Sequence, residues 1–390
     1  MDFESSHEVA ARLHVHVRTV QKWAKEGKLP GAKRMGKTWM LPKGTKGPGV
    51  SDEHLDYVMP LLNASFTPGN CLREIESLAN KVERDIAYGE YYYFSGQPGE
   101  AVKAVEPYLY HQDIGISLSA SVIYVLSALS LGEIGKRIHA MEDKVVDINQ
   151  RMIAMTNTPE LGDFAVTAAL FQNAIAVMMH LPMEIKGELK INLKNLHDGK
   201  KLFGAYVAAH HYYLKQEYDL ALGVAETALL LIPGDYVIAS IYLKLMIATI
   251  LITLRKTKLA KKYFMEAWQM AKPDGLIEPF AEHYTLLHGL TEVCLKQHDT
   301  EGFQQIIQAT QRYNKGWTVY HEKATRKVIS DSLTPTEFTV AMLYNKSWTV
   351  KEIAAHLEIS ERMVKHHIGI TYEKLGISSR EGLKTYMPNR

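Results

Sequence analysis

The stretch of sequence that decides the fold lies at residues 333–383 and reads LTPTEFTVAMLYNKSWTVKEIAAHLEISERMVKHHIGITYEKLGISSREGL. Residues 334–337 place a capping hydroxyl, a proline at the first helical position and a carboxylate at the third, which predicts a helix from about Pro335. Residues 349–352 repeat the reciprocal cap and predict a second helix. After a short break at residues 358–359, Ser360 is predicted to cap a third helix.

The third predicted helix separates apolar from polar side chains. Apolar residues at helical spacing can pack inward, namely Val364, Ile368 and Leu375. Basic or small residues lie on or near the opposite side, namely Arg362, Lys365, His366 and Gly369. Two short helices joined by a tight turn, with basic groups on the outer side of the second, fit the major groove of DNA. The stretch therefore predicts a helical unit that reads DNA.

Five short motifs in this stretch resemble the LuxR/GerE-type helix-turn-helix. They are L-T-P-x-E at 333–337, K-E-I-A at 351–354, I-S-E at 359–361, V-K-x-H at 364–367 and K-L-G-I at 374–377. The resemblance implies a DNA-binding domain at residues 331–390 that acts as a homodimer on double-stranded DNA. It also implies five candidate DNA contacts, namely Lys351, Arg362, Lys365, His366 and His367. The family usually has threonine at the position of Met363, and many relatives have a polar side chain at the position of Gly369.

Residues 1–46 predict a second DNA-binding domain of a different type. A capping box at residues 5–8 opens one helix, a second helix runs from about Val17 to Lys25, and residues 32–34 and 38–41 predict a hairpin, or wing. The motifs E-V-A-x-x-L, V-x-x-R-T-V-x-x-W and G-K-L-P resemble the winged helix-turn-helix of the excisionase and MerR-like group. The candidate DNA contacts here are His16, Arg18, Thr19, Gln21, Lys22, Arg34 and Lys37. The alternative is that this domain docks onto a protein.

Residues 31–38 also satisfy the phosphate-loop pattern G-x-x-x-x-G-K-T. A phosphate loop needs a buried strand before it and a helix after it, so that backbone amides converge on the anion. Here a basic helix precedes the pattern and a glycine-rich segment follows it. We therefore assign these residues to the wing and expect no nucleotide cofactor.

The middle of the chain, after a predicted linker at residues 47–51, is helical in pattern from residue 52 to residue 330. Residues 92–101, 212–221 and 251–260 share one frame, in which apolar or aromatic residues, a polar turn and an alanine follow one another, and a weaker copy begins at Ser130. The predicted fold class is therefore mainly α: a tetratricopeptide-like solenoid flanked by the winged and LuxR-type domains. Residues 267–271 and 278–282 resemble the closing repeats of MalT-like regulators, without the nucleotide-hydrolysing domain of those proteins.

The residues of the chain favour neither an enzyme nor a metal site. No acid, base and nucleophile converge in a recognisable motif. The adjacent pair His210 and His211 would point in different directions on a helix, so packing is the favoured role. Two cysteines without C-x-x-C spacing suggest a reducing compartment. An apolar run at residues 238–254 is short for a bilayer, and we expect a cytoplasmic protein without a membrane span.

The charge is distributed unevenly along the chain. Residues 1–49 hold ten Lys and Arg against four Asp and Glu, a net charge of +6, whereas residues 331–390 have a net charge of +1 and the middle is acidic, at −5. A basic domain suits phosphate contact. The sequence thus predicts a transcription regulator in which the repeats sense a small-molecule effector or a protein partner. The alternative is a scaffold whose repeats bind a partner peptide.

Overall fold

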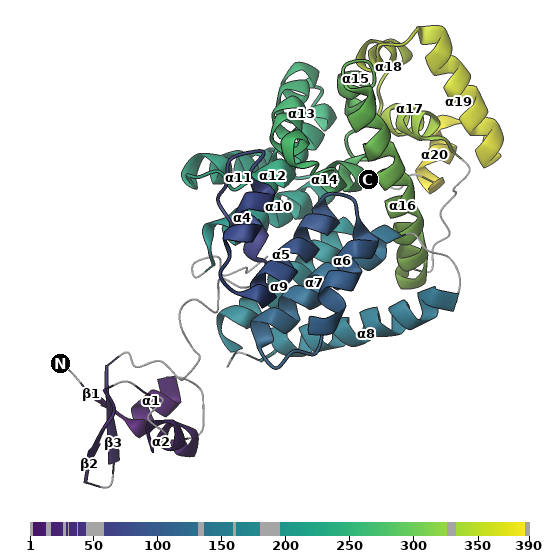
Figure 1. Ribbon diagram of the computed structural model, residues 1–390. Helices are drawn as coiled ribbons and strands as arrows, with labels where there is room; N and C mark the ends of the chain where they lie inside the picture. The colour runs from purple at the N-terminus through teal and green to yellow at the C-terminus, as the bar shows by residue number, and fades with distance from the viewer. Residues whose placement is uncertain are drawn as a thin grey trace.

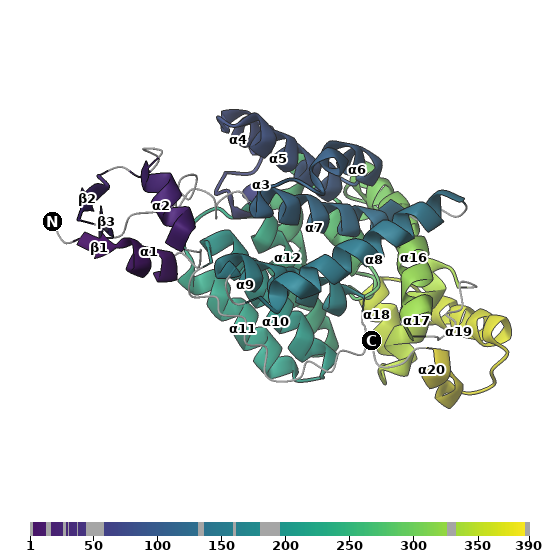
Figure 2. The same cartoon turned by 90° about the horizontal axis from the view of Figure 1, so that it is seen from below.

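The computed structural model describes residues 3–12, 17–25, 29, 31–36, 38–43, 58–131, 136–158, 161–179, 196–325 and 333–386. Figures 1 and 2 show a small amino-terminal domain, a helical body and a carboxy-terminal group of helices beside that body. The predicted linker at residues 47–51 lies outside the described residues, as do His16 and Lys37.

The amino-terminal domain combines two helices with a three-stranded sheet. Its elements are β1 (Phe3–Ser5), α1 (Ser6–Arg12), α2 (Val17–Lys25), β2 (Lys33–Met35) and β3 (Thr38–Pro42). The predicted capping box is present, since the backbone amide of Ser5 donates to the Glu8 carboxylate at 2.7 Å and that of Glu8 to the Ser5 hydroxyl at 3.3 Å. Strand β3 pairs antiparallel with both β1 and β2, so the predicted wing is confirmed and gains an unpredicted third strand.

The helical body is built from hairpins of helices. Its elements are α3 (Pro60–Asn63), α4 (Cys71–Ser77), α5 (Lys81–Phe94), α6 (Pro98–Val105), η2 (Glu106–Tyr108), α7 (Ile114–Leu131), α8 (Lys136–Thr156), α9 (Asp163–Met178), α10 (Asp198–Leu214), α11 (Tyr218–Leu231), α12 (Val237–Thr253), α13 (Thr257–Ala271), η5 (Lys272–Asp274), α14 (Glu278–His283), α15 (Leu290–Leu295) and α16 (Thr300–Thr325). The long helix α16 packs against α7 and α14 (Figure 1).

The three predicted repeat turns have the same geometry. Each joins two packed helices, α5 to α6, α10 to α11 and α12 to α13. In each turn one residue has a positive φ, namely Gly96 at 73°, Gln216 at 65° and Arg255 at 60°. The amide that follows donates back across the turn to Tyr92, Tyr212 or Leu251, at 2.7, 2.9 and 2.8 Å. The repeated sequence pattern therefore corresponds to the same turn structure at three places in the chain. The continuous solenoid remains a prediction.

Helix α7 is the one helix among the described residues whose length and composition would allow it to cross a membrane. Most of it, 83%, is buried inside the body, where it packs against α5, α6, α8 and α16. Helix α12 is buried in the same way between α10, α11 and α13. A helix that is apolar on every face is expected at the centre of a multilayered helical body.

The carboxy-terminal group consists of α17 (Pro335–Asn345), α18 (Val350–Leu357), α19 (Glu361–Leu375) and α20 (Arg380–Tyr386). The two predicted capping boxes are present at Thr334 and Thr349, and the Ser360 hydroxyl accepts from the backbone amide of Met363 at 3.2 Å. Glu358 adopts a left-handed backbone, φ 56°, at the predicted break. The short helix α20 was not predicted.

Candidate nucleic-acid interface

Helix α19 presents a polar, solvent-exposed face. Its inner side is anchored by Val364 and Leu375, which are buried, and by the half-buried Ile368, as predicted. The side chains of Arg362, Lys365 and His366 are exposed on the other side, as is the backbone at Gly369, where an added Cβ would meet nothing within 4 Å. A helix with an exposed basic face and no overhanging side chain at its middle can approach base edges closely.

The remaining predicted contacts of this domain have different surroundings. Lys351 is exposed in the first turn of α18. His367 is half-buried, and the pKa of its imidazole is lowered by burial and by the neighbouring His366. Met363 was not among the predicted contacts, yet this residue is 43% exposed on α19.

A half-buried ion pair fixes α19 against α17. The Lys374 ammonium lies 2.7 Å from the Glu337 carboxylate, whose side chain is only 8% exposed. The same Glu337 carboxylate accepts from the backbone amide of Thr334 at 2.8 Å and so completes the capping box. The carboxylate therefore joins the start of α17 to the end of α19, and Lys374 is a structural residue of the domain.

The side of the domain that faces away from α19's exposed face is docked on the helical body. Arg255, in the third repeat turn, donates to the Glu352 carboxylate at 2.5 Å and to the backbone carbonyl of Ser347 at 2.9 Å. Its guanidinium also lies 5.6 Å from the ring centre of Trp348, a residue that is 3% exposed. A second ion pair, Lys261 with Glu358, is 2.7 Å long.

Buried groups complete this docking contact. The Nε2 atom of His356 donates to the backbone carbonyl of His288 at 2.8 Å, and both rings are buried. Burial lowers the pKa of both imidazoles, so both are neutral near pH 7. Next to His288, Gly289 has a φ of 88° and lies so close to Leu357 that an added Cβ would come within 2.3 Å of that side chain. These contacts define the docking interface, formed by residues 255, 261 and 288–289 of the body and residues 346–358 of the domain.

The docking interface is incompletely packed. A cavity of about 310 Å³ lies where Glu292 of α15, and Lys296 just after that helix, face Thr336, Thr339 and Leu357. In closely packed interiors, voids much larger than a water molecule are rare. The carboxy-terminal domain is thus held by a few specific contacts around an open space.

The amino-terminal domain also exposes basic side chains. Val20 and Ala24 of α2 are buried, whereas Arg18 and Lys22 are exposed and Gln21 is half-buried. Arg34 is exposed on β2. The side chain of Thr19 lies outside the described part of the structure. The phosphate-loop pattern falls on the β2–β3 hairpin, where Thr38 begins a strand, so the wing assignment stands.

Comparisons with known families match the two ends of the chain. The family model for bacterial regulatory proteins of the luxR family matches residues 331–387, and a helix-turn-helix domain model matches residues 5–44. Searches among curated proteins and among solved structures returned no match. The chain therefore carries a luxR-family helix-turn-helix domain and a second helix-turn-helix domain, and it is a DNA-binding regulator.

Proposed function

We propose that the chain is a cytoplasmic transcription regulator in which the helical body controls how the carboxy-terminal domain is presented to DNA. The observation that carries this proposal is the docking interface. The body contacts the carboxy-terminal domain through α18 and its flanking turns and leaves the outer face of α19 exposed. This contact gives a body that binds an effector or a partner a physical link through which DNA binding can change.

The composition of the interface suits reversible docking. Exposed ion pairs, such as those of Arg255 and Lys261, contribute at most about 1 kcal/mol each. The buried ring of Trp348 and the bond between His356 and His288 add the remaining affinity. Such a contact is strong enough to favour one orientation of the domain and weak enough for a ligand to shift it.

On DNA, α19 is proposed to enter the major groove. Lys365, Arg362 and His366 would reach base edges, and Lys351 a phosphate. The exposed Met363 would suit the methyl group of a thymine. Two copies of the chain would occupy a two-fold site, so the proposed assembly is a homodimer on double-stranded DNA.

A second candidate function, a scaffold that binds a protein at the repeats, is favoured by a separate observation. Leu230 and Leu231, at the end of α11, are 83% and 69% exposed, and Leu220 on the same helix is 48% exposed. Neighbouring exposed leucines are a common feature of protein-binding surfaces. The two functions differ in whether DNA binding responds to the docking interface.

Charge reversal of Arg255 tests the proposed control. The variant Arg255→Glu places two carboxylates together and removes the cation from Trp348, so hydrogen exchange in α18 should become faster. The Kd for operator DNA should change by about threefold or more in either direction. The matched control is Lys262→Glu on the same helix as Lys261, because Lys262 is 68% exposed and, among the described residues, forms an ion pair with Glu266 of the body. Equal exchange and equal Kd in both variants would contradict control through this interface.

Salt dependence tests the amino-terminal domain. Lys22→Ala in the full chain should reduce the slope of log K against log salt by about 0.9 if Lys22 contacts one phosphate. Lys103→Ala on α6, whose side chain is 73% exposed, serves as the control and should leave the slope unchanged. An unaltered slope for Lys22→Ala would instead favour a protein-docking role for this domain.

A further inference from the structure

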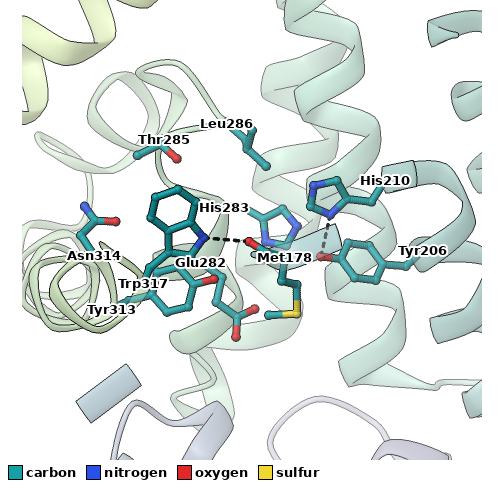
Figure 3. A pocket seen from close by; sticks show the side chains of 10 residues that line it. All are labelled: Met178, Tyr206, His210, Glu282, His283, Thr285, Leu286, Tyr313, Asn314 and Trp317. Atoms are coloured by element: carbon teal, nitrogen blue, oxygen red, sulfur yellow. Dashed lines mark hydrogen bonds between the residues drawn. The ribbon is translucent and has the colours of Figure 1, made fainter. Parts of the chain in front are cut away.

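A small pocket lies in the body between α10, α14 and α16 (Figure 3). Its volume is about 40 Å³, and its walls include Tyr206, His210, Glu282, His283, Tyr313 and Trp317. Asn314, on its rim, is exposed to solvent. A cavity of this size holds about three water molecules. It is large enough for the head group of a small ligand whose remainder extends past Asn314.

The pocket presents hydrogen-bond acceptors. One carboxylate oxygen of Glu282 accepts from the Tyr93 hydroxyl, and the Tyr242 hydroxyl also interacts with this carboxyl group. The Oε2 atom is buried and makes no well-aligned hydrogen bond to the described residues. The Nδ1 atom of His283 donates to the backbone carbonyl of Pro279 at 2.8 Å, which leaves Nε2 as a bare acceptor. That atom is also buried and has no partner in the described part of the chain. Burial lowers the pKa of His283 to about 4, so the ring is neutral near pH 7.

The indole donor on the aromatic wall is already used. The indole nitrogen of Trp317 donates to the backbone carbonyl of Met178 at 3.0 Å. The rings of Trp317, Tyr313 and Tyr206 line the same space as the Glu282 carboxylate (Figure 3). Aromatic rings and a buried carboxylate attract cations, and unpartnered acceptors require a ligand that donates hydrogen bonds.

We propose that this pocket binds the ammonium group of a small organic amine, and that the amine is the effector of the regulator. The ammonium would donate to Glu282 Oε2 and His283 Nε2. Burial raises the pKa of Glu282 to about 8, so near pH 7 the ammonium would stabilise the ionised carboxylate and the carboxyl proton would pass to the solvent. An anion would meet the Glu282 carboxyl group and the His283 acceptor, so the pocket disfavours carboxylates and phosphates.

A short segment of the chain links the pocket to the docking interface. Thr285 and Leu286 line it, and two residues later the backbone carbonyl of His288 accepts the hydrogen bond from His356. Gly289, beside it, packs on Leu357 of the carboxy-terminal domain. An ammonium held by Glu282 and His283 would therefore fix the segment on which the domain is docked. This step rests on the proposed function, whereas the binding of the amine does not.

Calorimetric titration of the full chain with methylammonium chloride tests the site. The expected result is saturable binding that Glu282→Gln weakens by about tenfold or more, since a neutral amide replaces the carboxylate. Glu278→Gln is the matched control, because Glu278 is an equally buried carboxyl one turn earlier on α14 that does not line the pocket. It should retain or strengthen the affinity, because Glu278 reinforces the raised pKa of Glu282 and its removal favours the ionised carboxylate. Tetramethylammonium, which has no N–H group, should bind much more weakly.

Three outcomes would overturn the proposed site: no heat of binding with methylammonium up to about 50 mM, a concentration that would reveal even weak association; equal losses in the two glutamine variants; or equal binding of tetramethylammonium. The coupling has its own readout, the Kd for operator DNA with and without methylammonium. Binding of the amine together with an unchanged DNA affinity would support the site and contradict its role as the switch of the proposed regulator.

Discussion

Replacing Lys365 with alanine is expected to weaken binding to operator DNA by about tenfold or more, with a much smaller effect on DNA of unrelated sequence. Lys365 is exposed near the first turn of α19, where a recognition helix meets base edges. A specific contact between a basic side chain and a guanine contributes about 1–3 kcal/mol of discrimination. Fluorescence anisotropy with the two DNAs, at one salt concentration, measures both affinities.

Two further variants separate the groove contact from other effects. Lys351→Ala should weaken binding to both DNAs by a similar factor, because a phosphate contact carries no sequence information. Lys384→Ala, at an exposed position on α20, should change neither. If Lys365→Ala weakened binding to both DNAs equally, Lys365 would be a phosphate contact. If it changed neither, α19 would not be the recognition helix.

The elements that could be predicted from the sequence are those set by neighbouring residues. The caps at Thr334, Thr349 and Ser360 involve partners only three residues away, so residue type and spacing were sufficient. The three repeat turns were predictable for the same reason. Strand β1 is only three residues long, which is too short for an alternating pattern to be recognised. It forms because its backbone pairs with the edge of β3.

The docking interface and the pocket could not be predicted. Arg255 and Glu352 are 97 positions apart, and each alone looks like an ordinary surface residue. Glu282 lies four residues after Glu278, a spacing typical of a solvated helix face. Only the packing of α5, α12 and α16 around the short helix α14 turns both carboxyls inward. Tertiary contacts of this kind leave no local signal in a single sequence.

The variant Glu282→Gln is expected to change the pH dependence of stability. Burial, reinforced by the nearby Glu278, raises the pKa of Glu282 from 4.5 to about 8, although the hydroxyls of Tyr93 and Tyr242 oppose this. Between these two values the folded chain binds the proton more tightly than the unfolded chain does. The contribution of Glu282 to the free energy of unfolding is therefore fully present below about pH 4.5. This contribution is lost as the pH rises towards 8, by at most about 1.4 kcal/mol per pH unit.

The histidines act in the opposite direction at lower pH. Burial lowers the pKa of His283 from 6.5 to about 4, so its contribution to stability increases as the pH rises through that range and is complete above about pH 6.5. Between pH 6.5 and 8 the buried glutamates dominate, since burial also raises the pKa of Glu278 to about 7 and that of Glu90 to about 8. A change in stability between pH 6.5 and pH 8 therefore reports on the buried carboxyl groups and not on His283.

Urea unfolding of the wild-type chain at pH 6.5 and pH 8 should show a loss of stability that is smaller in Glu282→Gln, by about 1–2 kcal/mol. Phosphate buffer is required, because an amine buffer could occupy the pocket. Glu301→Gln, at an exposed position on α16, should follow the wild type. Equal losses in all three chains would mean that Glu282 is ionised in the folded protein throughout this range. A carboxylate that is already ionised would need a cation or another donor beside it. Repeating the urea unfolding at both pH values with methylammonium present would then show whether the ammonium replaces that partner.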